Sequence, residues 1–458
     1  MRVFFPYAYY YPEQCAGIYV VDDLMCAFAE AGIESYLSVP TPTRNVAPDA
    51  KWFRTENKFD GKVVVHRFRM YAEGKNPIMR ALRYLLCECE QLHFLLWKKY
   101  DVIFIDSTPP IQGLKLPILK LFRKKTIIFN IHDLFPETLT GTGLAKSGGL
   151  LWKIGMWVSN VTFRNSDKII AISNDIKRSM VARGVPAEKI EVIYNWVDEK
   201  AVRPVAKEDN PLFEEFGLSR DRFTIVYAGN LGNAQNIGII LQAARQLKDD
   251  DLNDDDDDKQ KAGGDEKKVN VNVKVKVDPQ FVIFGTGGLE EELRKEIEKE
   301  HLDNVRLLPL QPFERVSQVY SLGDACVVSC KAGLGGSAMP SKTWSILSCG
   351  RPVIANFDEG ELKEILEKNN CGVFSHAGNV EEFVAAIKQL AENKDLCEEM
   401  GKNARQFILN NLTKEVGTRK YVEVIKSMAV TGKREEGRGM KEEVRGKRDE
   451  VRSKREEG

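Results

Sequence analysis

The stretch GGSAMPSKTWSILSCGRPVIAN, residues 335–356, decides the fold. Proline is tolerated at the start of a helix but not inside one, so Pro340 marks a start, and Gly350 marks an end. The stretch therefore predicts a short helix over Lys342–Ser348, whose first amides are capped by the side chain of Ser341. An apolar run follows that helix, and a helix leading into a buried strand is the repeating unit of a parallel α/β sheet.

Short apolar runs, separated by amphipathic stretches, recur along the rest of the chain. Runs that are apolar on both faces are typical of buried strands in a parallel sheet. The series pauses near residue 200 and restarts, which predicts two Rossmann-like, doubly wound α/β domains facing across a cleft. The predicted strands are 2–7, 35–39, 63–68, 101–106, 126–131, 168–173 and 190–195, then 223–228, 281–285, 305–310, 325–329, 352–356 and 371–375.

Domain boundaries follow from the same pattern. We expect an N-terminal domain at 1–200, a C-terminal domain at 201–412, and a helix at 413–430 that returns to the N-terminal domain. Two charged segments interrupt this plan: an acidic and Lys-Val insert at 249–278, and a tail at 431–458. The acidic half of the insert and the tail lack the apolar residues needed for a core, whereas the alternating stretch VNVNVKVKV could pair as a strand. No chemistry is assigned to either segment.

Composition excludes several classes of protein. The chain of 458 residues has 67 basic and 67 acidic residues, so no nucleic-acid partner is expected. Nine cysteines without a CxxC pair, and only five histidines, argue against a zinc site or a disulfide framework. The N-terminus lacks the pattern of a signal peptide, and no segment has the roughly 20 apolar residues of a membrane span. These features predict a cytoplasmic protein.

Three strand–glycine–helix turns fall at the predicted carboxyl edge of the second sheet: 226–236, 284–293 and 335–342. Glycines let a ligand approach the main chain, and a helix N-terminus beside Lys342 suits a phosphate. None of the turns matches the GxGxxG fingerprint, which argues against an NAD-dependent dehydrogenase. Each turn taken alone is equally explained as a tight turn without a ligand.

In the first domain, His132 and Asp133 follow a predicted strand at the edge where ligands bind in this architecture. A histidine can donate or accept a proton near neutral pH. Gly17 stands at the transition from the first strand to the first helix. A purely structural role for His132 remains open.

Taken in order, these stretches resemble the retaining GT-B glycosyltransferases of family 4, the group-1 glycosyl transferases, in a branch with a PSK…GRPVIA motif. The resemblance runs from about residue 1 to residue 430, without the insert. The stretches that carry it are HDLFPE, AISNDIKRSMVARGVPAEKIEVIYNWVD, YAGNLGNAQN, FVIFGTG, VRLLPLQPFERVSQVYSLGDACVVS and PSKTWSILSCGRPVIA.

The resemblance implies transfer of a hexosyl or N-acetylhexosaminyl group from a nucleoside-diphosphate sugar to a hydroxyl acceptor, with retention. The acceptor would be a saccharide or a lipid-linked molecule, in surface polysaccharide or lipid-linked oligosaccharide synthesis. No metal or other cofactor is implied. His132 and Lys342 would be the catalytic residues. The implied donor-binding residues are Gly17, Gly229, Asn230, Gly285, Gly287, Ser337, Ala338, Ser341, Ser345, Asp358 and Glu361.

The chain departs from the family pattern at several positions. Ser337 and Ser345 stand where the family has two glutamates, and Asn230 and Gln235 stand where it has a basic pair. Trp196 replaces a glycine at the domain junction. These departures leave two alternatives open: a nucleotide-sugar epimerase of the same fold, and a catalytically degenerate nucleotide-binding subunit.

Residues 77–99 and 149–168 are rich in leucine and tryptophan with flanking cations. Such stretches can touch a bilayer, so a peripheral contact with the inner face of the membrane, or with a lipid-linked acceptor, is one interpretation. Helices that turn these residues into the core are the other.

Overall fold

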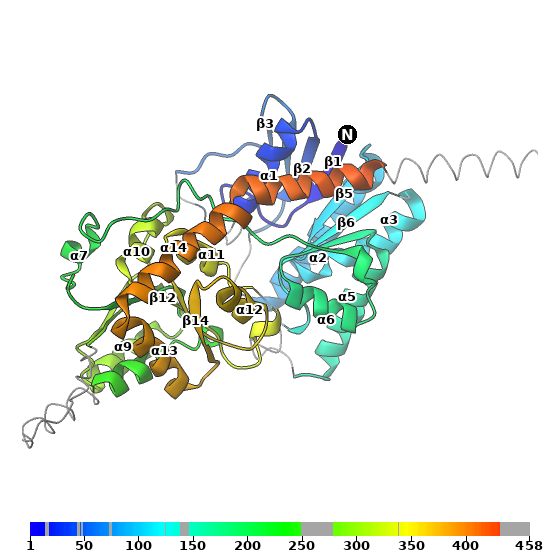
Figure 1. Cartoon of the computed structure of the whole chain (residues 1–458). Helices are drawn as coiled ribbons and strands as arrows, with labels where there is room; N and C mark the ends of the chain where they lie inside the picture. Colours follow the sequence, from blue (N-terminus) through cyan, green and yellow to red (C-terminus); the bar gives the residue numbers. More distant parts are fainter. Residues whose placement is uncertain are drawn as a thin grey trace, which may run out of the picture. The chain divides into compact units, whose positions relative to one another are not determined.

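The computed structural model describes residues 1–13, 18–43, 46, 49–72, 76–123, 125–137, 146–248, 278–337 and 339–430. The tail, all of the insert before Asp278, and the candidate residues Gly17 and Ala338 lie outside these ranges. The chain divides into two compact units (Figure 1). Unit 1 comprises Met1–Pro136, Lys146–Tyr194 and the chain from Glu415 onward, and unit 2 comprises Glu137–Ala145 and Asn195–Lys414.

Unit 1 contains an eight-stranded sheet in the order β3-β4-β2-β1-β5-β6-β7-β8. All neighbours are parallel except β3 and β4, which pair antiparallel at one edge. Every strand predicted in this part of the chain is present, and β3 was missed because its sequence TENK is polar. The strands are β1 (Arg2–Pro6), β2 (Glu34–Pro40), β3 (Thr55–Lys58), β4 (Val63–Phe68), β5 (Val102–Asp106), β6 (Thr126–Ile131), β7 (Lys168–Ala171) and β8 (Ile190–Val192).

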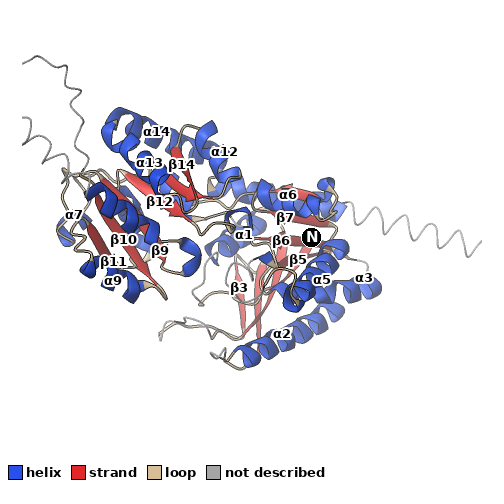
Figure 2. Ribbon diagram, turned by 90° about the horizontal axis from the view of Figure 1, so that it is seen from below, coloured by secondary structure: helices blue, strands red, loops and turns tan. Residues whose placement is uncertain are grey.

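The helices of unit 1 connect these strands (Figure 2). Gly32, with φ of +74°, follows α1, and its left-handed backbone conformation ends that helix. A helix at residues 414–430 also belongs to unit 1, although unit 2 precedes it in the chain. The other helices are α1 (Ile18–Glu30), α2 (Pro77–Trp97), α3 (Leu116–Arg123), α5 (Leu150–Asn165) and α6 (Asn174–Ala182), with 3₁₀ turns at Pro110–Lys115 and Ala187–Lys189.

Unit 2 contains a six-stranded, all-parallel sheet in the order β11-β10-β9-β12-β13-β14. From β9 the chain builds outward through β10 and β11, then returns to build β12, β13 and β14 on the other side. The junction of β9 and β12 is therefore a topological switch point, where ligands bind at the carboxyl ends of strands. The strands are β9 (Thr224–Asn230), β10 (Gln280–Thr286), β11 (Val305–Pro309), β12 (Ala325–Ser329), β13 (Val353–Phe357) and β14 (Gly372–His376).

The helices of unit 2 cover this sheet and bury its apolar strands. Trp196, at the position of the family's glycine, is itself almost fully buried. Among the described helices, none is both long and apolar enough to span a membrane. The helices are α7 (Leu212–Glu215), residues 238–248, α9 (Glu290–Lys299), α10 (Val316–Leu322), α11 (Lys342–Ser348), α12 (Glu361–Lys368), α13 (Val380–Glu392) and α14 (Lys394–Asn411).

Candidate functional site

Helix α11 has the bounds that the sequence predicts, but its start differs from the prediction. Ser341 adopts helical backbone angles, and its side chain caps no amide, so the predicted cap was wrong. The amides of Thr343 and Trp344 instead donate to the carbonyl oxygens of Pro340 (3.0 Å) and Ser341 (3.2 Å). Main-chain groups thus already use two of the donors in the first turn of α11.

The ammonium group of Lys342 is buried against an aromatic ring. Its Nζ lies 3.9 Å from the centre of the Tyr227 ring and has no hydrogen-bond partner within the described part of the chain. Burial lowers the pKa of Lys342 to about 7. A cation–π contact satisfies none of the three N–H donors, and a buried charge without a partner is costly. This is the arrangement expected of a cation whose partner is a bound anion.

Tyr227 is itself held in place on β9. Its hydroxyl donates to the carbonyl oxygen of Asn230 at 2.8 Å, and burial raises its pKa, so the ring stays neutral. The Asn230 side-chain amide donates to Gln235 at 3.3 Å. Gly229, with φ of +145°, leaves room for the lysine, because a Cβ there would stand 3.0 Å from Lys342 Nζ. The switch point therefore brings together Lys342, Gly229 and Asn230. The sequence analysis predicted all three at this carboxyl edge of the sheet.

The glycines at the end of β10 have a packing role. A Cβ on Gly285 would stand 2.6 Å from the carbonyl oxygen of Gly229, and one on Gly287 would stand 2.6 Å from that of Leu231. Both distances are too short for any side chain. The tight approach of two strand ends accounts for these glycines without a ligand, so their donor contact stays a prediction.

Asp358 anchors the glycine-rich loop before α11. Its carboxylate accepts the amides of Gly333 (3.1 Å) and Gly335 (2.7 Å). Gly335 packs tightly here, since a Cβ would meet the Phe357 ring at 2.8 Å. The predicted donor-binding aspartate thus positions a loop through its own hydrogen bonds.

The remaining candidates of unit 2 occupy varied settings. Glu361 is buried at the start of α12, and Ser345 is half-buried within α11. Ser337 closes the 3₁₀ turn Gly335–Ser337. Neither Glu361 nor Ser345 forms a hydrogen bond with Lys342 Nζ, which has no hydrogen-bond partner among the described residues. Among the described residues there is also no cluster of His, Cys, Asp and Glu suited to a metal ion.

In unit 1, His132 is the centre of a hydrogen-bonded network at the end of β6. Its Nε2 lies 3.0 Å from Asp106 Oδ1, at the end of the neighbouring strand β5. The side-chain amide of Asn130 also donates to Asp106 Oδ1, at 3.1 Å, and the Tyr421 hydroxyl donates to Asn130 Oδ1 at 2.9 Å. The Asn130 amide nitrogen lies 3.0 Å from His132 Nε2 as well, so Nε2 faces both an amide donor and a carboxylate acceptor. Because a carboxylate only accepts, we assign the hydrogen to Nε2, with the Asn130 amide donating to Asp106, and this leaves Nδ1 as the nitrogen available to a ligand.

The protonation of His132 follows from this network. Burial opposes the charged form, but the charge and hydrogen bond of Asp106, with help from Asp133, raise the pKa of His132 above its ordinary value. The folded state therefore holds the proton more tightly than the unfolded chain. The resulting stabilisation is complete below pH about 6.5 and is lost as the pH rises through the folded-state value.

Family models match both units. A model of Glycosyltransferase Family 4 matches residues 19–201, and a model of the group-1 glycosyl transferases matches residues 209–407.

The chain belongs to the group-1, family 4 glycosyltransferases. It is similar to WcaI of Escherichia coli (strain K12), which is named as a colanic acid biosynthesis glycosyl transferase, with 26% identity over 80% of this chain and 85% of the relative. Among solved structures it is similar to the sucrose-phosphate synthase of Thermosynechococcus elongatus (TM-score 0.70, 15% identity, 94% and 99% of the two chains). It is also similar to Anabaena HepE in complex with UDP-glucose (TM-score 0.64, 15% identity, 93% and 100%). These likenesses establish the GT-B fold.

Three residues of this glycosyltransferase escaped the sequence analysis. Asp106 ends a predicted strand, and that position was a usable signal. Asn130 lies inside the apolar run of β6 and offered a weaker one. Tyr421 stands 291 positions from Asn130, so nothing in the local sequence connects them.

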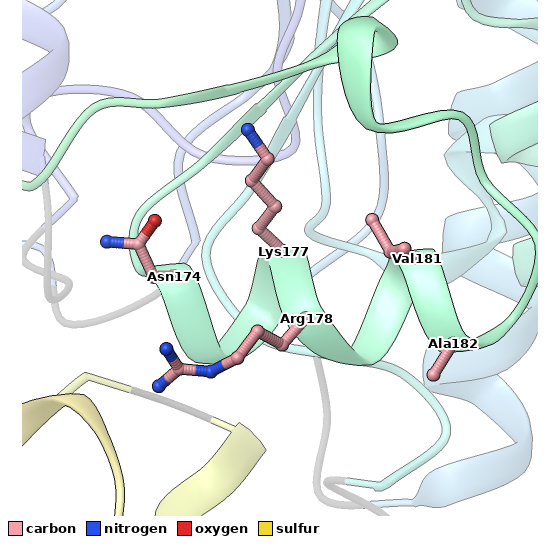
Figure 3. A pocket seen from close by; sticks show the side chains of 5 residues that line it. All are labelled: Asn174, Lys177, Arg178, Val181 and Ala182. Carbon is pink, nitrogen blue, oxygen red and sulfur yellow. The ribbon is translucent and has the colours of Figure 1, made fainter.

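An open surface hollow of about 440 Å³ lies elsewhere in unit 1 of the glycosyltransferase (Figure 3). Its lining comes from one helix, α6, and includes Asn174, Lys177 and Arg178. Asn174 donates to the Tyr194 hydroxyl, and Arg178 pairs with Asp175. None of the predicted site residues lines this hollow, and we assign it no role in catalysis.

The variant Gly285→Ala tests the packing role of that glycine. The added methyl group collides with main chain, so we expect a loss of about 1–3 kcal/mol in the free energy of unfolding, measured by urea denaturation. Gly288→Ala is the matched control, because a Cβ there meets nothing within 4 Å. Equal stability of the two variants would contradict the packing role.

The pairing of His132 with Asp106 can be tested by NMR titration of the imidazole Cε1 proton. We expect a pKa above about 6.5 in the wild type and below it in Asp106→Asn, because burial then dominates. Asp60→Asn, at an exposed position, is the control. An unchanged titration in Asp106→Asn would rule out the pairing.

Proposed function

We propose that this glycosyltransferase moves a hexosyl or N-acetylhexosaminyl group from a nucleoside-diphosphate sugar to a hydroxyl of a saccharide or lipid-linked acceptor, with retention, in the cytoplasm. The single observation that carries the proposal is the buried Lys342 ammonium at the switch point of unit 2, without a hydrogen-bond partner among the described residues. A diphosphate supplies the negative charge and the acceptors that this cation lacks.

The proposed role of Lys342 is electrostatic. Negative charge grows on the diphosphate as the sugar leaves, and a preformed cation in a water-poor setting stabilises that charge. Lys342 is about half protonated near pH 7 in the free protein, given its lowered pKa. A bound diphosphate raises that pKa again and draws a proton onto the lysine. Binding and charge stabilisation are thereby linked to proton uptake.

The proposed role of His132 lies with the donor sugar or the leaving group. The Nε2–H bond to Asp106 fixes the imidazole plane and leaves Nδ1 as the contact atom. Asn130 and Tyr421 hold Asp106 in turn, so the orientation of His132 does not depend on the substrate. Such preorganisation avoids the cost of ordering the group during the reaction.

Relatives support the substrate class. WcaI is named for colanic acid biosynthesis, and HepE has been solved with UDP-glucose. The name of WcaI is consistent with a role in surface polysaccharide synthesis. The ligand of HepE makes UDP-sugars the first donors to test. We further propose that the PSK…GRPVIA stretch, with Lys342 at its centre, marks the branch of the family in which the lysine takes over from the usual basic pair.

A nucleotide-binding subunit without turnover is the second candidate. Ser337 and Ser345 in place of the family's glutamate pair favour it. The epimerase alternative is weaker, because it requires acid–base groups near the sugar. His376 of unit 2 is exposed and already pairs with Glu359 and Glu382. Release of UDP from a UDP-sugar by the protein would exclude the binding-only candidate.

The variant Lys342→Met tests the diphosphate contact. Loss of a charge-assisted hydrogen bond of about 1.5–3 kcal/mol should weaken UDP binding roughly 10- to 150-fold. Titration calorimetry at pH 8 in two buffers of different ionisation enthalpy should show proton uptake in the wild type and none in the variant, because the free lysine has a pKa of about 7.

Lys402→Met, at an exposed position on α14, is the matched control and should bind UDP as the wild type does. Removing an unpaired buried charge should leave the stability of Lys342→Met equal to or above that of the wild type. Equal UDP affinity in Lys342→Met and the wild type would remove the lysine from the site.

The variant His132→Gln tests the second role. We expect a fall in kcat of roughly 100-fold or more with UDP affinity changed less than about threefold, since general acid–base or transition-state contacts act on turnover. Initial rates of UDP release, compared with UDP affinity from calorimetry, measure both. Parallel losses in rate and affinity would indicate a binding role instead.

A further inference from the structure

Three helices of unit 1 carry apolar side chains on their exposed faces. On α2 these residues recur at helical spacing, i, i+1, i+4, i+7 and i+8, and on α5 at i, i+1, i+4 and i+7. Their exposed fractions reach 76% at Ile78 and 78% at Leu150. The apolar face consists of Ile78, Met79, Leu82, Leu85, Leu86 and Trp97 of α2, Ile118, Leu121 and Phe122 of α3, and Leu150, Leu151, Ile154 and Trp157 of α5.

The three helices form one layer. Helix α3 packs against both α2 and α5 (Figures 1 and 2). Three strand–helix–strand crossovers advance in the same direction along the sheet order. They are β4–α2–β5, β5–α3–β6 and β6–α5–β7. Right-handed crossovers that advance the same way place their helices on the same side of a sheet. The exposed stripes therefore belong to a continuous surface rather than to scattered positions.

The inner side of α2 explains why its apolar residues point outward. Arg83, Glu88 and Gln91 are buried, although such residues usually face solvent. Glu88 forms an ion pair with buried Lys115 at 2.8 Å, and Gln91 donates to the carbonyl oxygen of Tyr7 at 2.9 Å. The inner side of α2 therefore includes buried polar groups next to Cys87 and Leu95. Of the two interpretations of these stretches, the one with core-facing helices does not hold for the residues of the apolar face.

Exposed cations outnumber exposed carboxylates beside the apolar face. Lys115 and Lys120 do not count toward this charge, because Lys115 is buried against Glu88 and Lys120 pairs with Asp167. Arg80 of α2 and Arg164 of α5 are exposed, as is one carboxylate of α2, Glu90. Lys99, just after α2, and Lys153, on α5, are exposed beside the apolar residues. Cations flanking exposed leucine, phenylalanine and tryptophan are the composition of a surface that lies in a membrane interface, where aromatic and aliphatic groups enter the acyl boundary and lysines meet anionic headgroups.

We propose that the apolar face docks on a lipid bilayer containing anionic headgroups. Exposed apolar surface of this extent on adjacent elements marks an interaction site. The basic flanks select an anionic bilayer over a second copy of this chain, because two copies would bring like charges together at the contact. The inference stands on unit 1 alone and does not depend on the sugar donor.

Vesicle flotation tests the docking. Wild-type protein should float with vesicles of phosphatidylcholine plus phosphatidylglycerol and much less with phosphatidylcholine alone. The triple variant Leu85→Gln, Leu121→Gln and Leu150→Gln should lose about tenfold or more in vesicle affinity, because each change removes apolar area that the bilayer would cover. The pair Leu310→Gln and Leu409→Gln, at exposed leucines of unit 2, is the matched control.

Two further experiments distinguish docking on an anionic bilayer from docking on a second copy of this chain. Lys99→Gln with Lys153→Gln should weaken binding to the anionic vesicles and leave weak binding to neutral vesicles unchanged. Size-exclusion chromatography should give the same oligomeric state for the wild type and the triple leucine variant. The proposal is overturned if the wild type binds neither vesicle, if the triple variant binds as the wild type does, or if the triple variant dissociates an oligomer of the wild type.

Discussion

The contact between the Lys342 ammonium and the face of Tyr227 is the constraint around which the strand edge of unit 2 is organised. Tyr227 is fixed by its bond to the Asn230 carbonyl, and Gly229 must lack a side chain so that the lysine can pass. The closely packed glycines of β10 support the same strand end from the other side. Burial of the ammonium group lowers its pKa to about 7, which records the cost of removing this charge from water.

The two units differ in whether the buried polar groups of the candidate site have hydrogen-bond partners within the protein. In unit 1, His132 is embedded in a network that satisfies Asp106, Asn130 and Tyr421 within the protein. In unit 2, Lys342 lacks such a network among the described residues. A satisfied network gives a rigid, oriented group, whereas an unsatisfied cation gives affinity for a charged ligand. The division is consistent with one unit that orients a reacting group and another that binds the donor.

The sequence predicted the strands well because a buried parallel strand must be apolar on both faces, as in residues 126–131. It failed at β3, whose polar edge residues lack that signal, and at Ser341, whose helical backbone angles prevent the capping contact. Helical periodicity predicted α2 but not its orientation, because a stripe at spacing i, i+4 has the same pattern whether it faces core or solvent. His132 and Lys342 were predicted as site residues from their positions at strand and helix ends, and that prediction stands untested. Asp106 was overlooked, and no local sequence pattern connects Tyr421 to this network.

The position of the helix at residues 414–430 affects the order in which unit 1 can fold during synthesis. Tyr421 donates a hydrogen bond to Asn130 in the His132 network. In the sequence it follows β8 by more than two hundred residues and comes after the whole of unit 2, so the ribosome synthesises it after both sheets. While the nascent polypeptide emerges from the ribosome, the first sheet can form, but Asn130 stays incompletely bonded until that helix arrives. The hydrogen-bond network around His132 is therefore completed only after the second sheet has been synthesised.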